Sequence, residues 1–580
     1  MRKKLPLLLI TTFFSIGLMA QYYLRGEIKD EKGRLLPGVK INLHSKGRLP
    51  FYSGNTGAFG LPTTVRIDTI SLWLEGFEPF KQAVNTTEYQ VFTLKMLPAT
   101  ASLMKNRLAS ATKNLAAIDQ LSMFSSFGES YSSIIENTFI DANVYPETGF
   151  ALNIDRASYS NIRRFINNGM NIPRDAVRIE EMLNYFSYKS QPQNNTPQFL
   201  CNTKVTNCPW NNQSQLCYIN LQAPKLNLDS IPPSNLVFLI DVSGSMDKPN
   251  RLPLLQAGFK LLTSNLRAID TISIVTYGGG VAVPLPPTGG NEKDKINQVI
   301  DSLYADGDTP GEGAIRTAYA VAKRAFIRNG NNRVIIATDG DFNVGQTNEK
   351  DLEDLIVFQR LSGIYLTCLG VGMGNYKDSK LETLAKKGNG NFAYLDNIYE
   401  AEKVLVTEFT KTLYSVANDA YASINFNPQI VKKYRLIGFD NKKEAMTDTS
   451  SQIEGGEVGS GHSLMAIFEI ETENNIVSNA NVASIHLQYI QAATKRILKQ
   501  QFQVPYAVED IMQIEKPYRF STAVAMFGSL VKESLFAKKY TFSDVIQLAK
   551  SALEDNNFAQ QEFLQLVQKA DKIYNHKKKR

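Results

Sequence analysis

Two carboxylates and three hydroxyls in the sequence have the types and spacing of a cation site. Asp241, Ser243 and Ser245 follow the apolar run "NLVFLI", Thr309 stands in "DGDTPGEGAI", and Asp339 ends "RVIIATD". Oxygen ligands without histidine or thiolate suit Mg²⁺ or Mn²⁺ rather than Zn²⁺ or Cu²⁺. Because Mg²⁺ usually keeps bound waters, such a site leaves a coordination position that an outside carboxylate could take. The residues therefore predict a Mg²⁺ (or Mn²⁺) site.

Residues 234–418 supply the elements that must position these side chains. Short, wholly apolar runs alternate there with amphipathic helical segments. Runs that are apolar on both faces are strands buried between two helix layers, so the alternation predicts a parallel, doubly wound α/β sheet. Asp241 and Asp339 each end such a strand, and we expect adjacent strands to bring them together at the carboxyl edge of the sheet, where open α/β sheets bind ligands.

The simplest alternative is a capped turn that holds no ion, because Asp and Ser favour helix entries in any case. Thr309 and Asp339 complete the oxygen set and favour the ion. Asp247 and Asp341 are near neighbours, and we interpret both as solvated loop residues.

The rest of the chain divides by pattern. Strand-like segments precede and follow residues 234–418, which predicts a multidomain protein with an α/β domain inserted in a β-rich domain. Asp155 is a candidate N-cap for the helix that follows it. The predicted units are a signal peptide (1–20), an N-terminal β-sandwich (21–96), a linker (97–145), a flank of helices and strands (146–233), the α/β domain (234–418), a β-rich flank (419–504), C-terminal helices (505–575) and a basic tail (576–580).

The segments "FLIDVSGSM" and "ATDGD", together with Thr309, resemble the von Willebrand factor A domain and its metal-ion-dependent adhesion site. The resemblance implies that Ser243, Ser245 and Thr309 are metal ligands and that Asp241 and Asp339 bind directly or through water. It also implies a protein partner that presents an acidic residue to the ion. One departure is Asp308, where the family has a serine; its carboxylate could tighten cation binding or repel an acidic ligand.

The flanking segments resemble further families. Residues 130–575, with "PRDAVRIEEMLNYFSY" and "YRFSTAVAMFG", resemble a bacterial extracytoplasmic family with a dedicated N-terminal flank and a C-terminal domain of unknown function around the A domain. Its D-V-D-T-A-S stretch is replaced here by residues 153–158, "NIDRAS". Residues 21–96, with "GEIKDEKGRLLPGV" and "TGAFGL", resemble the carboxypeptidase regulatory-like domain found in Bacteroidetes-type envelope proteins.

The net charge of +7 over 580 residues would suit a nucleic-acid partner, but the positive charges that produce it lie at the two ends of the chain. Arg2, Lys3 and Lys4 precede the apolar run 5–18, which is typical of a signal peptide cleaved after Ala20, with an uncleaved anchor as the alternative. A second basic run closes the chain at 577–580, and without these two segments the formal charge is balanced. The balance argues against a nucleic-acid partner. We expect export to the periplasm or cell surface, with no integral membrane span in the mature chain.

Four cysteines are too few for a disulfide scaffold. Cys201, Cys208 and Cys217 cluster, so one bridge among them is possible, but the sequence does not select it. Cys368 lies in the apolar run "GIYLTCLGVG" and is expected to be a buried thiol.

These observations predict a non-enzymatic, divalent-metal-dependent protein-binding or adhesion module of the bacterial envelope. One alternative is an envelope scaffold in which the ion is incidental. A Mg²⁺-dependent hydrolase is the other, but no general base is evident beside Asp241, and no phosphate-binding loop is present. The sequence does not indicate the oligomeric state.

Overall fold

The computed structural model describes the chain in two units, divided between Arg107 and Leu108. The first unit covers residues 1–107 and the second 108–580. The residues described are 22–95 (without 32, 37, 48, 49, 55, 75 and 76), 129, 131, 134–188 (without 153), 198–226, 231–307, 311–340, 349–373, 378–408, 414–439, 441–442, 456–473 and 480–576. The predicted signal peptide and basic tail lie outside these residues, except for His576.

The first unit consists of two small sheets that enclose a core of its own. One sheet has the order β4-β1-β7 and the other β3-β2-β5-β6. Apolar residues alternate along the strands and meet between the sheets, as Leu24, Ile41 and Leu72 illustrate. The strands are β1 (Tyr22–Asp30), β2 (Lys40–Leu43), β3 (Pro50–Tyr52), β4 (Ala58–Thr63), β5 (Ile67–Trp73), β6 (Phe80–Asn85) and β7 (Tyr89–Leu94).

A six-stranded sheet of order β15-β14-β13-β16-β17-β18 forms the centre of residues 234–418. Its strands are parallel except for β15, which pairs antiparallel with β14. Every residue of β13 is buried, as expected for a central strand covered on both faces. The strands are β13 (Ser234–Asp241), β14 (Thr271–Tyr277), β15 (Val281–Gly289), β16 (Asn331–Thr338), β17 (Ile364–Val371) and β18 (Phe392–Leu395).

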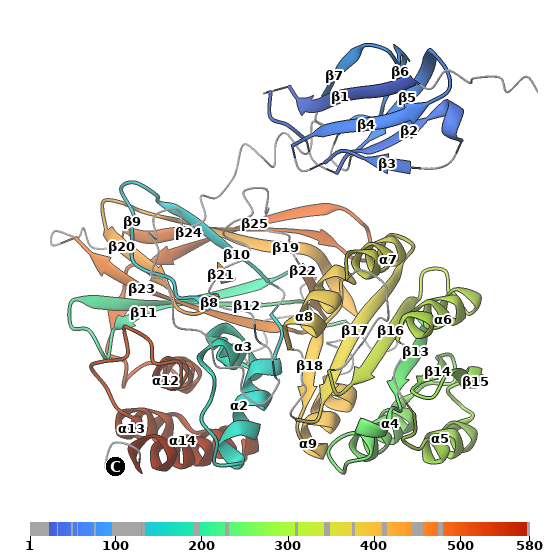
Figure 1. Cartoon of the computed structure of the whole chain (residues 1–580). Coiled ribbons are helices and arrows are strands. Elements are labelled where there is room, and N and C mark those ends of the chain that lie inside the picture. The colour runs from blue at the N-terminus through green and yellow to red at the C-terminus, as the bar shows by residue number, and fades with distance from the viewer. Residues whose placement is uncertain are drawn as a thin grey trace, which may run out of the picture. The chain divides into compact units, whose positions relative to one another are not determined.

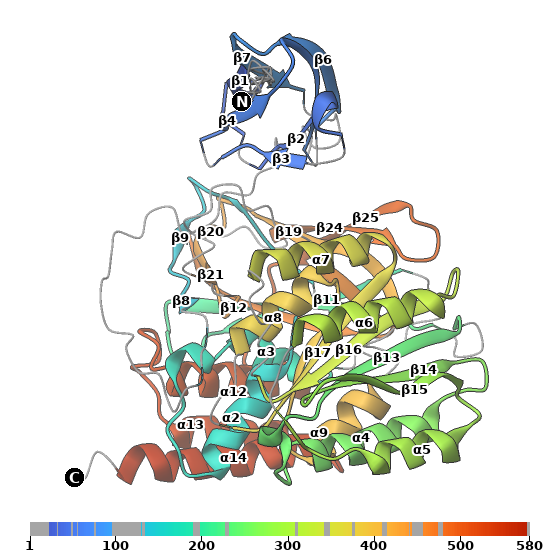
Figure 2. The same cartoon turned by 45° about the vertical axis from the view of Figure 1, so that its right-hand side comes forward.

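Helices cover both faces of this sheet (Figures 1 and 2). Val237 and Leu239 pack under one helix layer, whereas Leu236 and Phe238 pack under the other. The first layer consists of α6 (Gly311–Arg324), α7 (Glu349–Leu361) and α8 (Asp378–Lys387); the second consists of α4 (Leu252–Asn265), α5 (Lys293–Ser302) and α9 (Ile398–Glu402). The predicted multidomain α/β organisation is confirmed.

Two further sheets pack face to face and share one core. Each combines strands that lie before and after the α/β segment: β12 pairs with β23, and β10 pairs with β19. One sheet contains β9 (Ile140–Asp141), β11 (Leu200–Asn207), β12 (Ser214–Gln222), β20 (Val431–Leu436), β23 (Ser463–Thr472) and β26 (Val508–Glu509). The other contains β10 (Glu147–Ala151), β19 (Ser415–Phe426), β22 (Gly456–Gly459), β24 (Asn481–Gln491) and β25 (Ile497–Pro505), and a separate pair joins β8 (Ile134–Ile135) to β21 (Asn441–Lys442).

Five helices with an aromatic core of their own cover the outer face of the β12–β23 sheet, some of them against the sheet and the others on top of those helices (Figure 1). Tyr159, Phe186 and Phe563 lie in that core, and Phe186 meets Phe563 edge to face at 5.7 Å. The helices are α2 (Ala157–Asn167), α3 (Ile179–Tyr185), α12 (Lys516–Val531), α13 (Phe542–Ala552) and α14 (Phe558–His576). In the described part of the chain, no helix combines the length and apolar character needed to cross a membrane.

The structure bears on three further expectations from the sequence, which concern the linker and the cysteines. β8 and β9 lie within 97–145, the segment predicted as a linker, and β9 pairs with β20. All four cysteines are free thiols, so no bridge forms among Cys201, Cys208 and Cys217. Cys368 is fully buried, as predicted.

Candidate metal centre

The described oxygen-bearing residues of the predicted site gather at the carboxyl ends of two neighbouring strands. Asp241 is the last residue of β13, and Asp339 directly follows β16, which pairs with β13 in parallel. The chain leaves β13 for β14 on one side and later returns to β16 on the other, so this edge is the topological switch point of the sheet. The predicted convergence of Asp241 and Asp339 follows from this strand order.

A tight loop places the two serines beside the carboxylates. Ser243 N donates to Asp241 Oδ1 at 2.9 Å, which fixes the turn out of β13. A 3-10 turn, Gly244–Met246, then brings the Ser245 hydroxyl to 3.1 Å from that of Ser243. Ser245 Oγ donates to Asp339 Oδ2 at 2.7 Å, so the oxygens of three residues form one contiguous group.

Asp241 is anchored from the side of the sheet. Its Oδ2 accepts hydrogen bonds from Thr338 Oγ1 at 3.0 Å and from the Tyr277 hydroxyl at 3.2 Å. Burial raises the pKa of Asp241 above its ordinary value, although the hydrogen bond from Ser243 N opposes this change. A nearby cation would favour the charged form of this buried carboxylate.

The donor set fits a small, hard dication. In an octahedron with metal–oxygen distances of about 2.1 Å, neighbouring oxygens lie about 3 Å apart. The Ser243–Ser245 and Ser245–Asp339 oxygen separations of 3.1 and 2.7 Å are close to that spacing. Asp339 Oδ1 is fully buried, and among the described residues no group donates a hydrogen bond to it. A buried carboxylate oxygen without a donor is costly, and a cation would satisfy it.

Thr309 and its neighbour Asp308 lie outside the described residues. The start of their loop is described and contacts the serine loop directly. Gly244 N donates to Gly307 O at 3.0 Å, and Asp306 N donates to Val242 O at 2.7 Å. Asp341 also lies outside the described part, whereas Asp247 is exposed, as expected of a solvated loop residue.

Arg251 is a member of this centre that the sequence did not reveal. Its guanidinium forms an ion pair with Asp339 Oδ2, and its Nη1 also donates to Ser245 O at 2.6 Å. Its Nη2 donates to Met373 O at 2.7 Å, at the end of the neighbouring strand β17. No local pattern around Arg251 indicates this role, because two of its three partners, Asp339 and Met373, are distant in the sequence.

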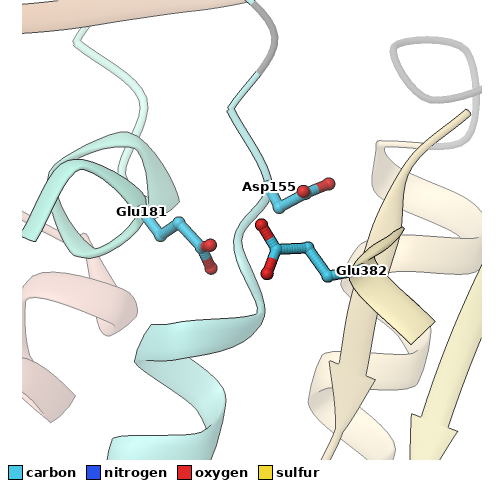
Figure 3. A group of neighbouring side chains, drawn as sticks. All are labelled: Asp155, Glu181 and Glu382. Atoms are coloured by element: carbon cyan, nitrogen blue, oxygen red, sulfur yellow. The ribbon is translucent and has the colours of Figure 1, made fainter. Parts of the chain in front are cut away.

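A second group of carboxylates lies between the helical flank and the α/β domain (Figure 3). Asp155, Glu181 and Glu382 each place a carboxylate oxygen within 4.8 Å of the others. Two cations offset them: Arg178 pairs with Glu181, and Lys386 Nζ donates to Glu382 Oε1 at 2.6 Å. We interpret this group as a charge network that joins the two regions.

Asp155 does not cap α2, so that prediction is wrong. Arg156 occupies the N-cap position and makes no capping bond with its side chain. Asp155 Oδ1 instead accepts from Phe392 N of β18 at 2.9 Å. This long-range bond ties the segment before α2 to β18.

Family models match three parts of the chain. A von Willebrand factor model matches residues 125–218, a von Willebrand factor type A domain model matches 236–341, and a model of the C-terminal region of uncharacterized protein YfbK matches 411–573. The chain is similar to a solved von Willebrand factor type A protein from Catenulispora acidiphila, with 14% identity, coverage of 63% of this chain and 88% of that chain, and a TM-score of 0.39.

The chain is also similar in sequence to several curated proteins. Human inter-alpha-trypsin inhibitor heavy chain H2 is 24% identical over 218 residues, which are 36% of this chain and 22% of that protein. The uncharacterized protein YfbK of Escherichia coli (strain K12) is 36% identical over 473 residues, which cover 76% of this chain and 81% of YfbK. The chain therefore belongs to the YfbK family and carries a von Willebrand factor type A domain.

Proposed function

We propose that this chain is a non-enzymatic, divalent-metal-dependent protein-binding module of the bacterial envelope. The observation that carries the proposal is the contiguous oxygen group of Ser243, Ser245 and Asp339 beside Asp241, with Asp339 Oδ1 buried and lacking a donor among the described residues. The von Willebrand factor type A family supports protein interaction as the use of this centre.

Ser243, Ser245 and Asp339 would hold Mg²⁺ (or Mn²⁺), with Asp241 binding directly or through water and Thr309 as a further proposed ligand. When bound, the ion supplies a coordination position that a carboxylate of a protein partner can occupy. The chain's own residues fix the geometry in advance, because Thr338 and Tyr277 hold Asp241 in place and Arg251 holds Asp339.

The wider organisation belongs to the same proposal. The pairing of β12 with β23 and of β10 with β19 supports an α/β domain inserted in a β-rich domain. Residues 1–20 support export, and residues 21–96 would form a carboxypeptidase regulatory-like spacer.

Affinity capture from an envelope extract tests the proposal. The full chain, immobilised, is expected to retain a partner in Mg²⁺ and release it in EDTA. A D241A/S243A variant should capture nothing. The control variant S264A replaces an exposed serine on α4 and should behave as the wild type. Equal capture in EDTA would favour the metal-independent scaffold instead.

A further inference from the structure

Arg251 places a fixed positive charge inside the proposed metal centre. The residue is only 4% exposed, and it lies at the N-cap of α4, between the serine loop and the end of β17. It forms an ion pair with Asp339 Oδ2 and donates to the carbonyl oxygens of Ser245 and Met373. A buried guanidinium with these contacts is part of the centre rather than a surface charge.

The end of β17 is shaped to admit this side chain. Gly372 has a left-handed backbone, with φ of +79°, and a Cβ added there would lie 2.5 Å from Arg251 Nε. The guanidinium therefore packs directly on the Gly372 backbone. Tyr394 of β18 also donates to Gly372 O, so a hydrogen bond from the neighbouring strand holds the loop that receives Arg251.

This charge changes the electrostatics of the centre. Among the described residues, Asp241 and Asp339 contribute two negative charges to the centre. The positive charge of Arg251 offsets one of them. Counted over these three described residues, a bound dication would leave a net positive charge, whereas it would only be neutralised by the two carboxylates alone. Because the Asp241, Asp339 and Arg251 side chains are almost fully buried, one unit of charge there strongly affects the affinity for both cations and anions.

We infer that Arg251 is the specificity-determining residue of the metal centre: it lowers the affinity for the dication and keeps the loaded centre electropositive, so that the centre selects an anionic ligand. This inference rests on the proposed function and deepens it. The ligand class that it favours is a carboxylate, whose charge complements the loaded centre.

The first test measures Mn²⁺ affinity in the full chain, by the electron paramagnetic resonance signal of free Mn²⁺. R251M and R251Q are expected to bind Mn²⁺ about tenfold more tightly than the wild type, because a nearby like charge is removed. R251K keeps the charge and should remain close to the wild type. R174Q, which alters an exposed ion pair, is the control and should change nothing.

The second test uses acetate as the carboxylate probe. Acetate that replaces a coordinated water lowers the relaxation enhancement that bound Mn²⁺ gives to water protons. In R251Q the affinity for acetate should fall about tenfold, since the loaded centre is less positive. The two affinities should therefore change in opposite directions, which a residue with a merely structural role would not produce.

Other results would overturn the inference. If R251M and R251Q bind Mn²⁺ as weakly as the wild type or more weakly, Arg251 only positions Asp339. If both variants stay unfolded at saturating Mn²⁺, Arg251 is a structural requirement. If wild type and variants alike bind no Mn²⁺, or if S243A/S245A binds it normally, the proposed function itself fails.

Discussion

At the residue level, Asp155 shows how the environment of one carboxylate sets a pH dependence. Burial, with Glu181 and Glu382 nearby, raises its pKa from 3.8 to about 7, although Lys386 opposes this shift. A carboxyl group with a raised pKa in the folded state stays protonated there while its unfolded counterpart ionises. Its contribution to stability is therefore present below about pH 4 and is lost as the pH rises from about 4 to about 7.

We expect D155N to reduce this loss. Asparagine keeps an oxygen for Phe392 N and carries no charge beside Glu181 and Glu382. The difference in the free energy of unfolding between D155N and the wild type should therefore shift in favour of D155N by more than about 1 kcal/mol from pH 5 to pH 8. Urea unfolding at the two pH values measures this difference; equal differences at both would show that Asp155 does not titrate in this range.

The same scale shows what the sequence could and could not predict. The sequence predicted that four of the oxygen-bearing side chains lie close together, because side chains at the ends of parallel strands meet at one edge of the sheet. These are Asp241, Ser243, Ser245 and Asp339. Arg251 was not predictable, because its role depends on the ends of β16 and β17, which the chain reaches much later.

At the element level, one of the links between the helical flank and the α/β domain is a buried arginine of α2. Arg163 Nε donates to Asp396 Oδ2 at 2.8 Å, and its Nη2 donates to Glu400 Oε2 at 2.7 Å. Its Nη1 donates to Glu562 Oε2 of α14 at 2.9 Å, so one guanidinium links three elements. The amphipathic pattern predicted the helices themselves, but not these ion pairs, because charged side chains carry no period that identifies their partners.

We expect R163M to destabilise the chain by about 3–5 kcal/mol, because Asp396 and Glu400 would remain buried without their cation. R174M is the matched control: it breaks an exposed pair with Glu533 and should cost less than about 1 kcal/mol. Chemical denaturation compares the two variants. A similar, small loss in both would mean that the Arg163 network contributes nothing beyond a surface ion pair.

At the scale of the whole molecule, the first unit has a hydrophobic core separate from those of the second. Leu72 is 1% exposed in that core, so L72A should destabilise the first unit by about 2–5 kcal/mol. Calorimetry of the full chain should show only one transition shifted, and Mn²⁺ affinity should be unchanged. A parallel loss of Mn²⁺ binding would show that the units depend on each other.

We expect the oxygen group at the ends of β13 and β16 to bind one divalent cation. Calorimetric titration of the full chain with Mg²⁺ tests it most directly, with S243A/S245A compared against S264A. We predict a single binding event in the wild type and in S264A, and none in S243A/S245A. The unfolding temperatures of all three proteins in EDTA should stay within a few degrees of one another. Unchanged Mg²⁺ binding in S243A/S245A would show that the ion is held elsewhere in the chain and that this oxygen group is not the metal site.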